Sequence, residues 1–334
     1  MTPQSYLHLE NDTLRVDVER EKKLQVPLHH LGSVVCLGNI MVSPALMHRC
    51  AEDGIALVLL DGNGRFKARL EGAVSGNILL RQAQHRQALD EKFALGIAQS
   101  MIAGKLRNSR QILQRGAREA LDETDSRALA DTVDTLANSL RNLPHAADLD
   151  VVRGIEGDAA KNYFSALSLI VKREYRGKFS MDGRTRRPPR DRFNALLSFL
   201  YSMLMNDCRS ALEAGGLDPQ LGFLHSVRPG RAALALDLME EFRAIFADRL
   251  ALTLINRGQI NADDFAEREG GAVMLEGDAR RTVVVAYQER KQEEVMHPLL
   301  ETKVPIGLLP LLQARFMART LRGEMEGYLP FLYR

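Results

Sequence analysis

The order of apolar and polar residues predicts strands at the beginning of the chain. Apolar and polar positions alternate over Tyr6–Glu10 and Leu14–Glu19, on either side of Asn11-Asp12, which is the pattern of a β-hairpin. Ser43-Pro44 predicts the start of a helix, with serine as its N-cap and proline in its first turn, and Gly54 predicts its end. Other short apolar runs predict strands at Val34–Leu37, Ile40–Val42, Ile55–Leu60 and Arg65–Leu70, the last two joined by a turn at Asp61-Gly62-Asn63-Gly64.

The rest of the chain has the spacing of helices. Gly72–Asn77 is rich in Gly, Ser and Ala and predicts a linker. Apolar residues then recur at helical spacing over residues 78–141, are interrupted at Pro144, and continue at this spacing from Val152 onward. Asn194–Leu212 is apolar almost all round, as expected of a buried central helix.

These patterns predict an α+β fold, with a small N-terminal β-rich domain, residues 1–77, followed by a larger all-α domain, residues 78–334. The length of 334 residues and the apolar content of 45% allow two domains with their own cores.

We expect a cytoplasmic protein without a membrane span. The longest apolar stretch, Ala195–Met205, is well short of the roughly 20 residues that a span needs. The N-terminus lacks the basic start and apolar stretch of a signal peptide. The three cysteines are widely spaced and form no CxxC pair, which predicts neither a zinc cluster nor a disulfide framework; they are Cys36, Cys50 and Cys208.

Basic residues are concentrated in the middle of the chain, although the net charge is only +2. Residues 161–192 hold ten Lys and Arg but three Asp and Glu. Within them, Gly177–Arg192 contains two prolines and predicts a loop rather than a continuous helix. Its five arginines repel one another and favour a polyanion such as a nucleic acid; they are Arg184, Arg186, Arg187, Arg190 and Arg192. A second basic segment, residues 103–118, could be a solvated helix face.

Candidate metal ligands lie in three separate segments. Glu156 stands between two glycines, and His225 precedes a Pro-Gly turn. Asp237, Glu240 and Glu241 are spaced i, i+3, i+4, which places them on one face of a helix. Crowded carboxylates need a compensating cation, and a hard divalent ion such as Mg²⁺ suits their oxygens. One added imidazole favours Mn²⁺ without excluding Mg²⁺. The set could hold a metal against a phosphodiester.

Each of these signals also has a structural interpretation. An acidic helix face is typical of solvated surface, and a single histidine is more often structural than a ligand. Glu156 could be an ordinary acid at the start of a helix, stabilised by the helix dipole. The chain contains no GxGxxG, Walker A or HExxH motif. The residues alone therefore leave both a metal site and an ordinary acidic surface open.

Several longer segments carry a family resemblance. They are GIEG followed by Tyr163-Phe164, RTRRPPRDRFNALLSFLYSML (Arg184–Leu204), HSVRPGR and LDLMEEFR, together with PLHHLGSVVCLGNIMVSPAL and ALVLLDGNGRF near the N-terminus and HPLL, KVPIG and QARFMARTLRGE near the C-terminus. In this order they resemble the CRISPR-associated integrase and endonuclease family, protein one of the CRISPR adaptation module. The resemblance covers nearly the whole chain, and the loop Arg184–Arg192 resembles that of the subtype I-C branch.

The resemblance implies a site and a fold. The family forms homodimers and pairs an N-terminal β domain with a helical domain, which implies a dimerisation domain at residues 1–77 and a catalytic and DNA-binding domain at residues 78–334. Its metal ligands correspond to Glu156, His225 and Glu240, with Asp237 assisting them, so that these four residues are the implied catalytic set. Many relatives have aspartate where Glu240 stands. Arg228 corresponds to a basic residue beside the active site, while Glu241 corresponds to no ligand.

The resemblance also implies a function. The family uses Mg²⁺ or Mn²⁺ to insert short captured DNA into the CRISPR array by transesterification. Its partners are double-stranded DNA, both the captured fragment and the CRISPR repeat, and a small dimeric protein of the same adaptation module. DNA contacts are expected from Arg228 and from four arginines of the loop, Arg184, Arg186, Arg187 and Arg190. Two alternatives remain: a standalone metal nuclease acting on branched or repair DNA, and a non-enzymatic DNA-binding scaffold.

Overall fold

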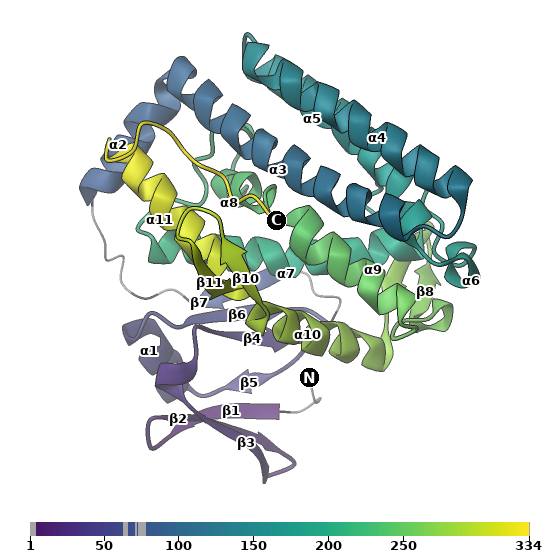
Figure 1. Cartoon of the computed structure of the whole chain (residues 1–334). Coiled ribbons are helices and arrows are strands. Elements are labelled where there is room, and N and C mark those ends of the chain that lie inside the picture. The colour runs from purple at the N-terminus through teal and green to yellow at the C-terminus, as the bar shows by residue number, and fades with distance from the viewer. Residues whose placement is uncertain (1–4, 63–65, 71, 73–77, 334) are drawn as a thin grey trace. The chain divides into compact units, whose positions relative to one another are not determined.

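The computed structural model describes residues 5–62, 66–70, 72 and 78–333 (Figure 1). The chain divides into two compact units, Met1–Gly76 and Asn77–Arg334, one residue away from the division drawn from the sequence. Most of the predicted linker and half of the predicted turn at Asp61–Gly64 lie outside the described residues.

The N-terminal unit consists of two small sheets and one helix. The first sheet has the order β3-β2-β1-β5, and the second has the order β4-β6-β7. Helix α1 packs against β1 and β6, one strand from each sheet. The elements are β1 (Ser5–Glu10), β2 (Thr13–Val18), β3 (Glu21–Pro27), β4 (Ser33–Leu37), β5 (Met41–Val42), α1 (Pro44–Glu52), β6 (Ala56–Leu60) and β7 (Phe66–Leu70).

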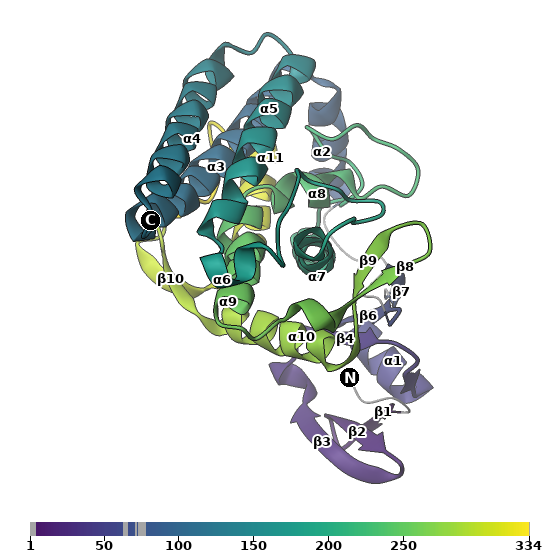
Figure 2. The same cartoon turned by 90° about the vertical axis from the view of Figure 1, so that its right-hand side faces the viewer.

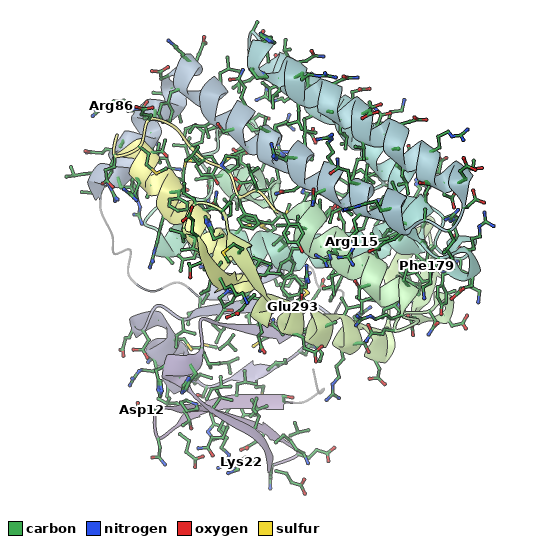
Figure 3. The ribbon with its side chains drawn as sticks, in the orientation of Figure 1. Asp12, Lys22, Arg86, Arg115, Phe179 and Glu293 are labelled. Atoms are coloured by element: carbon green, nitrogen blue, oxygen red, sulfur yellow. The ribbon has the colours of Figure 1, made fainter. Side chains whose placement is uncertain are left out.

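The predicted N-terminal hairpin and helix start are confirmed. Strands β1 and β2 pair antiparallel, and the turn residues Asn11 and Asp12 have φ angles of 47° and 55°, as a two-residue hairpin turn requires. The Ser43 hydroxyl accepts a hydrogen bond from the Leu46 N–H at 3.2 Å. Strand β3 was not predicted, because it is an exposed edge strand whose charged side chains, Lys22 among them, project from the sheet (Figure 3). Lysines on an edge strand discourage pairing with other chains.

The C-terminal unit is built mainly from helices (Figures 1 and 2). Helices α3, α4 and α5 lie side by side, and α7 runs through the middle of the unit, in contact with α8, α9 and α11. The buried side chains of α7 lie on nearly every side of the helix, which confirms the predicted central helix. The helices are α2 (Ile78–Leu89), α3 (Glu91–Glu119), α4 (Glu123–Asn142), α5 (Leu149–Leu167), α6 (Arg173–Arg176), α7 (Arg192–Ala214), α8 (Ala233–Met239), α9 (Arg249–Asn256), α10 (Gly277–Gln292) and α11 (Leu309–Leu321).

Aspartate side chains define the starts of the helices that build the site. Asp148 accepts hydrogen bonds from the N–H groups of Asp150 and Val151, both at 2.9 Å, and so caps α5. Asp191 accepts one from Asn194 N–H at 2.7 Å and caps α7. Each such cap contributes about 1 kcal/mol, and together they fix the residues at which these two helices begin.

Two hairpins interrupt the helices, so this unit is not all-α as predicted, although the α+β class is confirmed. Strand β8 (Phe265–Arg268) pairs antiparallel with β9 (Ala272–Leu275), and β10 (Glu294–His297) pairs with β11 (Thr302–Pro305). Strands of four residues are too short to show a clear period of two. None of the helices that the structure describes is long and apolar enough to cross a membrane.

The predicted basic loop is confirmed as irregular backbone between α6 and α7. The hairpin β8–β9 supports it, because Val273 N–H donates a hydrogen bond to the Pro189 carbonyl at 2.9 Å. At the other end, the Asn194 side chain donates to Gly183 O at 2.9 Å and accepts from Thr185 N–H at 3.1 Å. The loop is therefore held in a defined shape by the hairpin and by the first turn of α7.

Candidate active site

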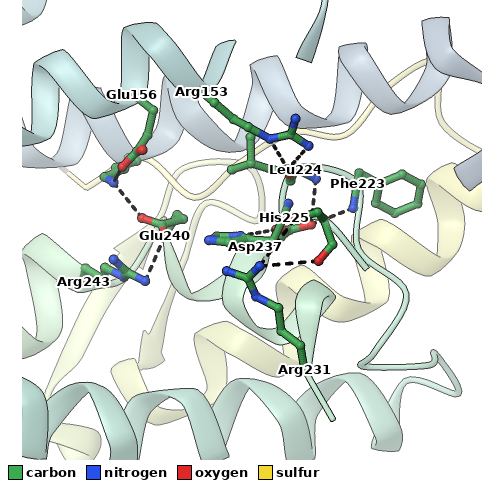
Figure 4. Close-up of polar contacts among 11 residues, drawn as sticks. Arg153, Glu156, Phe223, Leu224, His225, Arg231, Asp237, Glu240 and Arg243 are labelled. Atoms are coloured by element: carbon green, nitrogen blue, oxygen red, sulfur yellow. Dashed lines mark hydrogen bonds and ion pairs between the residues drawn. The ribbon is translucent and has the colours of Figure 1, made fainter. Parts of the chain in front are cut away.

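Glu156 lies in the middle of α5, not at a helix start as one interpretation of its two glycines suggested. One turn earlier on the same helix, Arg153 donates hydrogen bonds to the Leu224 carbonyl from Nε at 2.9 Å and from Nη2 at 2.7 Å. This contact fixes the segment that carries His225 against the helix that carries Glu156 (Figure 4). Two of the sequence-predicted residues are thus brought together by an arginine that the sequence analysis did not identify.

Asp237 holds His225 in one orientation. Its carboxylate is completely buried and accepts hydrogen bonds from the N–H groups of Phe223 at 2.7 Å, Leu224 at 3.0 Å and His225 at 3.0 Å. The same carboxylate lies 2.6 Å from Nδ1 of His225. A carboxylate at this distance keeps the proton on Nδ1, which leaves the lone pair on Nε2 free. Asp237 therefore positions the imidazole, while its own oxygens are fully engaged.

The chain passes so close to Asp237 that only glycine fits at position 222. A Cβ atom on Gly222 would lie 2.6 Å from Asp237 Oδ2 and 2.8 Å from the carbonyl carbon of Ala233. Both neighbours are held in place, one by its hydrogen bonds and the other by the backbone of α8. Gly222 thus permits the close approach through which three consecutive backbone N–H groups reach one carboxylate.

Asp237, Glu240 and Glu241 do not share a helix face, contrary to the prediction. Helix α8 ends at Met239, and Glu240 and Glu241 lie in the following turn, just before a π-helical stretch at Arg243–Asp248. The three carboxylates consequently point to different partners. Spacing in the sequence predicted a continuous helix here, and the break after Met239 is what separates them.

Glu240 is buried among cations. It is 3% exposed; its Oε1 lies 2.9 Å from a guanidinium nitrogen of Arg243 and its Oε2 lies 2.8 Å from Lys105 Nζ. Lys105 also forms an ion pair with Glu156. Burial acts to raise the pKa of Glu240, but the charges of Arg243 and Lys105 outweigh it and lower this pKa to about 2. Glu240 is therefore ionised over the whole physiological range.

Glu241 belongs to a different part of the molecule. It accepts hydrogen bonds from the Tyr328 hydroxyl, from Gln313 Nε2 at 3.1 Å and from Phe331 N–H at 2.8 Å. Burial raises its pKa to about 8, although these donors act to lower it. Glu241 thus anchors the C-terminal segment and is mostly neutral at pH 7, which agrees with leaving it out of the ligand set.

A second buried network lies behind Arg243. The guanidinium groups of Arg243 and Arg184 lie 5.0 and 5.2 Å from the ring centre of Tyr201. The hydroxyls of Tyr201 and Tyr163 donate to Asp248 at 2.6 and 2.9 Å, and burial raises the pKa of Asp248 to about 6. Tyr163 and Glu156 are seven residues apart on α5 and so lie on the same face. The network therefore fixes the helix face that presents Glu156.

A cleft of about 700 Å³ opens beside His225. Its lining includes arginines from the two loops that the sequence analysis singled out, and the buried Arg243; they are Arg184, Arg186, Arg187, Arg228, Arg231 and Arg243. Arg186, Arg187 and Arg228 are exposed and suited to contact phosphates. A cleft that combines these charges with one oriented imidazole fits a nucleic-acid backbone.

Two of the arginines predicted to contact DNA, Arg184 and Arg190, are less available to DNA in this cleft than Arg186, Arg187 and Arg228. The Arg184 guanidinium donates to Asn194 Oδ1 at 2.7 Å and to Ser198 Oγ at 3.1 Å, and burial lowers its pKa. It is therefore largely engaged within the protein. Arg190 is exposed but does not line the cleft, and it lies beside Gly271 in the β8–β9 hairpin.

The oxygen and nitrogen atoms of Glu156, Glu240 and His225 are chemically suited to bind a hard divalent cation. Among the described residues, no three His, Cys, Asp or Glu side chains are close enough together to hold a metal ion, and Lys105 occupies the space between Glu156 and Glu240. Glu240 Oε2 is nevertheless buried without a hydrogen bond, and its contact with Lys105 is an ion pair. Two carboxylates that already share a cation, beside an imidazole with a free Nε2, are ligands that Mg²⁺ or Mn²⁺ would accept.

The cations and hydrogen-bond donors that organise these acids were not predicted from the sequence. Arg243 stands three residues after Glu240, a spacing that could have indicated the ion pair. A solvated helix face is one interpretation of the segment 103–118, but its residue Lys105 is 7% exposed, so that interpretation is wrong for this residue. Arg153 had no sequence signal, because its partner is a backbone carbonyl 71 residues away.

The basic cleft, with carboxylates and one histidine beside it, fits an enzyme that acts on the phosphodiester backbone of a nucleic acid. Comparisons agree with this class. Residues 1–289 match the family model described as CRISPR associated protein Cas1. The CRISPR-associated endonuclease Cas1 1 of Moorella thermoacetica is 56% identical over 334 residues, covering 100% of this chain and 97% of the relative. The chain belongs to the Cas1 family of CRISPR-associated proteins.

Solved structures share the fold. A casposase bound to integration product has a TM-score of 0.81 at 22% identity, over 98% of this chain and 90% of the casposase chain. A partial Cas6-RT-Cas1–Cas2 complex has a TM-score of 0.69 at 25% identity, over 98% of this chain and 96% of the matched chain. The predicted family is confirmed, and with it the prediction of a CRISPR-associated endonuclease. The standalone repair nuclease and the non-enzymatic scaffold are not favoured.

Proposed function

We propose that the cleft holds a DNA phosphodiester next to Glu156, His225 and Glu240, and that these residues serve its transesterification during insertion of captured DNA. The 3′-hydroxyl oxygen of the fragment attacks the phosphorus at the repeat boundary and gives up its proton to solvent. The bond from that phosphorus to the 3′-oxygen of the repeat strand breaks, and the leaving oxygen takes up a proton. The observation that carries this proposal is one cleft that joins His225 to arginines of two separate loops.

The residues have separate roles in this proposal. Glu156, His225 and Glu240 would hold Mg²⁺ or Mn²⁺, which when bound stabilises the charge that develops on the phosphodiester oxygens. Asp237 keeps the proton on Nδ1 of His225 and directs Nε2 away from itself. Arg228 lies in the same cleft as His225 and holds a neighbouring phosphate, so that the reacting phosphodiester is positioned.

The proposed partners are double-stranded DNA, a second copy of the chain, and a dimer of the small adaptation protein Cas2. The Cas1–Cas2 assembly named for a solved structure of this fold supports the last of these. The N-terminal unit is the proposed dimerisation domain, because it exposes apolar side chains on several of its strands, namely Leu24, Val35 and Met41.

Strand transfer tests the proposed function directly. The purified chain, with and without Cas2, is given a short duplex with 3′-hydroxyl ends and a supercoiled plasmid that carries a leader and repeat, in Mn²⁺, Mg²⁺ or EDTA. We expect metal-dependent joining of the duplex to the repeat boundary. Cleavage without joining would indicate a nuclease, and binding without either reaction would indicate a scaffold.

The two exposed arginines of the loop that line the cleft give a prediction on binding. In the double variant Arg186→Ala/Arg187→Ala, we expect duplex binding to weaken at least about tenfold and the slope of log Kd against log salt to fall by about two, since each phosphate contact contributes about one. Fluorescence anisotropy over a salt series measures both quantities. Arg127→Ala is the control, because Arg127 is exposed and pairs with Glu123 on α4. An unchanged slope in the double variant would remove this loop from the DNA interface.

A further inference from the structure

Lys105 lies at the centre of the proposed metal site although it is not a metal ligand. It projects from α3 and is 7% exposed. Its ammonium group forms ion pairs with Glu156, from α5, and with Glu240, from the turn after α8. A single side chain therefore joins three segments that lie far apart in the sequence.

The charges around Glu240 explain how this buried carboxylate remains ionised. Glu240 is 3% exposed, and a buried carboxylate without a cation would be protonated or would reorganise its surroundings. Arg243 neutralises one side of Glu240, at Oε1. Lys105 is the cation that Glu240 Oε2 and Glu156 have in common, so it occupies the place where a shared metal ion would be bound.

We infer that Lys105 is an internal counter-ion that holds Glu156 and Glu240 together in the metal-free protein and must move aside before a divalent metal binds between them. This inference rests on the metal site of the proposed function. An ammonium group in hydrogen-bond range of both ligands would repel a divalent ion at close distance. The four-carbon stem of lysine allows the charged end to move while α3 stays in place.

Displacement of Lys105 makes metal binding and substrate binding cooperate. The released ammonium group requires a new anionic partner, and the phosphates of DNA in the adjoining cleft are the nearest that the reaction supplies. Metal binding is then more favourable when DNA is present, which restricts the reactive state of the site to the DNA complex. Lys105 acts here as a positioning residue for the two carboxylates rather than as a catalytic one.

Metal affinity measured without any reaction tests the inference. Isothermal titration with Mn²⁺ is compared for the unmodified chain, Lys105→Met and Lys105→Arg, each checked for folding by circular dichroism. We expect Lys105→Met to bind Mn²⁺ at least about tenfold more tightly, because the competing cation is gone, and Lys105→Arg to bind within about threefold of the unmodified chain. Unchanged or weaker binding by a folded Lys105→Met protein would overturn the inference. No binding by any of the three proteins would instead remove the metal site, and the inference with it.

Chemical labelling of the unmodified chain tests the same point without a variant. Acetic anhydride modifies lysines in proportion to their exposure, and peptide mass spectrometry measures each site. We expect Mn²⁺ to raise the labelling of Lys105 several-fold and to leave Lys161, an exposed lysine on α5, unchanged. In His225→Ala, which lacks one proposed ligand, Mn²⁺ should have a much smaller effect. Labelling of Lys105 that does not respond to saturating Mn²⁺ in the unmodified chain would show that the lysine stays in place and would contradict the inference.

Discussion

Replacement of Glu156 by glutamine is expected to lower strand transfer at least about a thousandfold while leaving duplex binding nearly unchanged. Glutamine keeps the size of the side chain but removes the charge that a divalent ion requires. Loss of several kcal/mol of charge stabilisation in the transition state corresponds to a loss of this size in rate. Duplex binding depends on the exposed arginines of the cleft, Arg186, Arg187 and Arg228, whereas Glu156 does not line the cleft. Single-turnover joining assays and anisotropy measure the two quantities separately.

The matched control for this variant is Asp158→Asn. Asp158 is exposed and lies on the same helix, two residues after Glu156, so the change removes an equal charge from α5 outside the site. We expect the control to keep its activity within about twofold. His225→Ala should behave as Glu156→Gln does, because it removes a second proposed ligand. A folded Glu156→Gln protein that joins DNA at the normal rate would show that the reaction does not need this carboxylate.

The parts of the fold that sequence patterns predicted are those in which local and long-range forces agree. The Ser43 cap, the Asn11-Asp12 turn and the apolar helix α7 each have a residue type that favours one backbone conformation and a burial pattern that fits it. Strand β3 and the β8–β9 hairpin lack this agreement. Their side chains are largely exposed or only partly buried, and pairing with a neighbouring strand, which no local pattern reveals, determines their conformation.

The residues of the site could be predicted where they share a sequence motif, but the contacts that each of them makes could not. Spacing suggested that Asp237 and Glu240 act side by side, yet the helix ends at Met239 and separates them. Asp237 faces three backbone N–H groups and His225, whereas Glu240 faces Lys105 and Arg243. Which carboxylate orients the histidine and which remains for a metal depends on tertiary contacts, because the residue types are chemically alike.

The buried cations were the hardest part to predict for the same reason. A lysine or arginine on a helix is usually solvated, and Lys105 occurs in a run of basic residues that looks like surface. Only the three-dimensional arrangement shows that two carboxylates from other segments face it. Buried charges of this kind are stable because they are paired, and the two pairing partners of Lys105 lie at least 51 residues away.

The second large effect is expected for Asp237→Asn, which should lower strand transfer about a hundredfold and weaken Mn²⁺ binding by a similar factor. The Asp237 carboxylate accepts hydrogen bonds from three backbone N–H groups and faces Nδ1 of His225. An asparagine amide turns one of these acceptor positions into a donor, so the imidazole loses its fixed orientation and tautomer. Residues that orient a metal ligand in this way typically contribute tenfold to a hundredfold.

A double-mutant cycle and a neighbouring control separate orientation from general damage. If Asp237 acts through His225, Asp237→Asn should lower the rate of strand transfer much less in a His225→Ala background than in the unmodified chain. The effects of substitutions at residues that act as one unit are not additive. Glu241→Gln is the control: Glu241 is equally buried and lies four residues later, but its contacts are with the C-terminal segment. Its pKa of about 8 means that the carboxyl is mostly neutral at pH 7, so glutamine resembles it and activity should stay within about threefold. Fully additive losses in the cycle would mean that Asp237 does not act through the histidine.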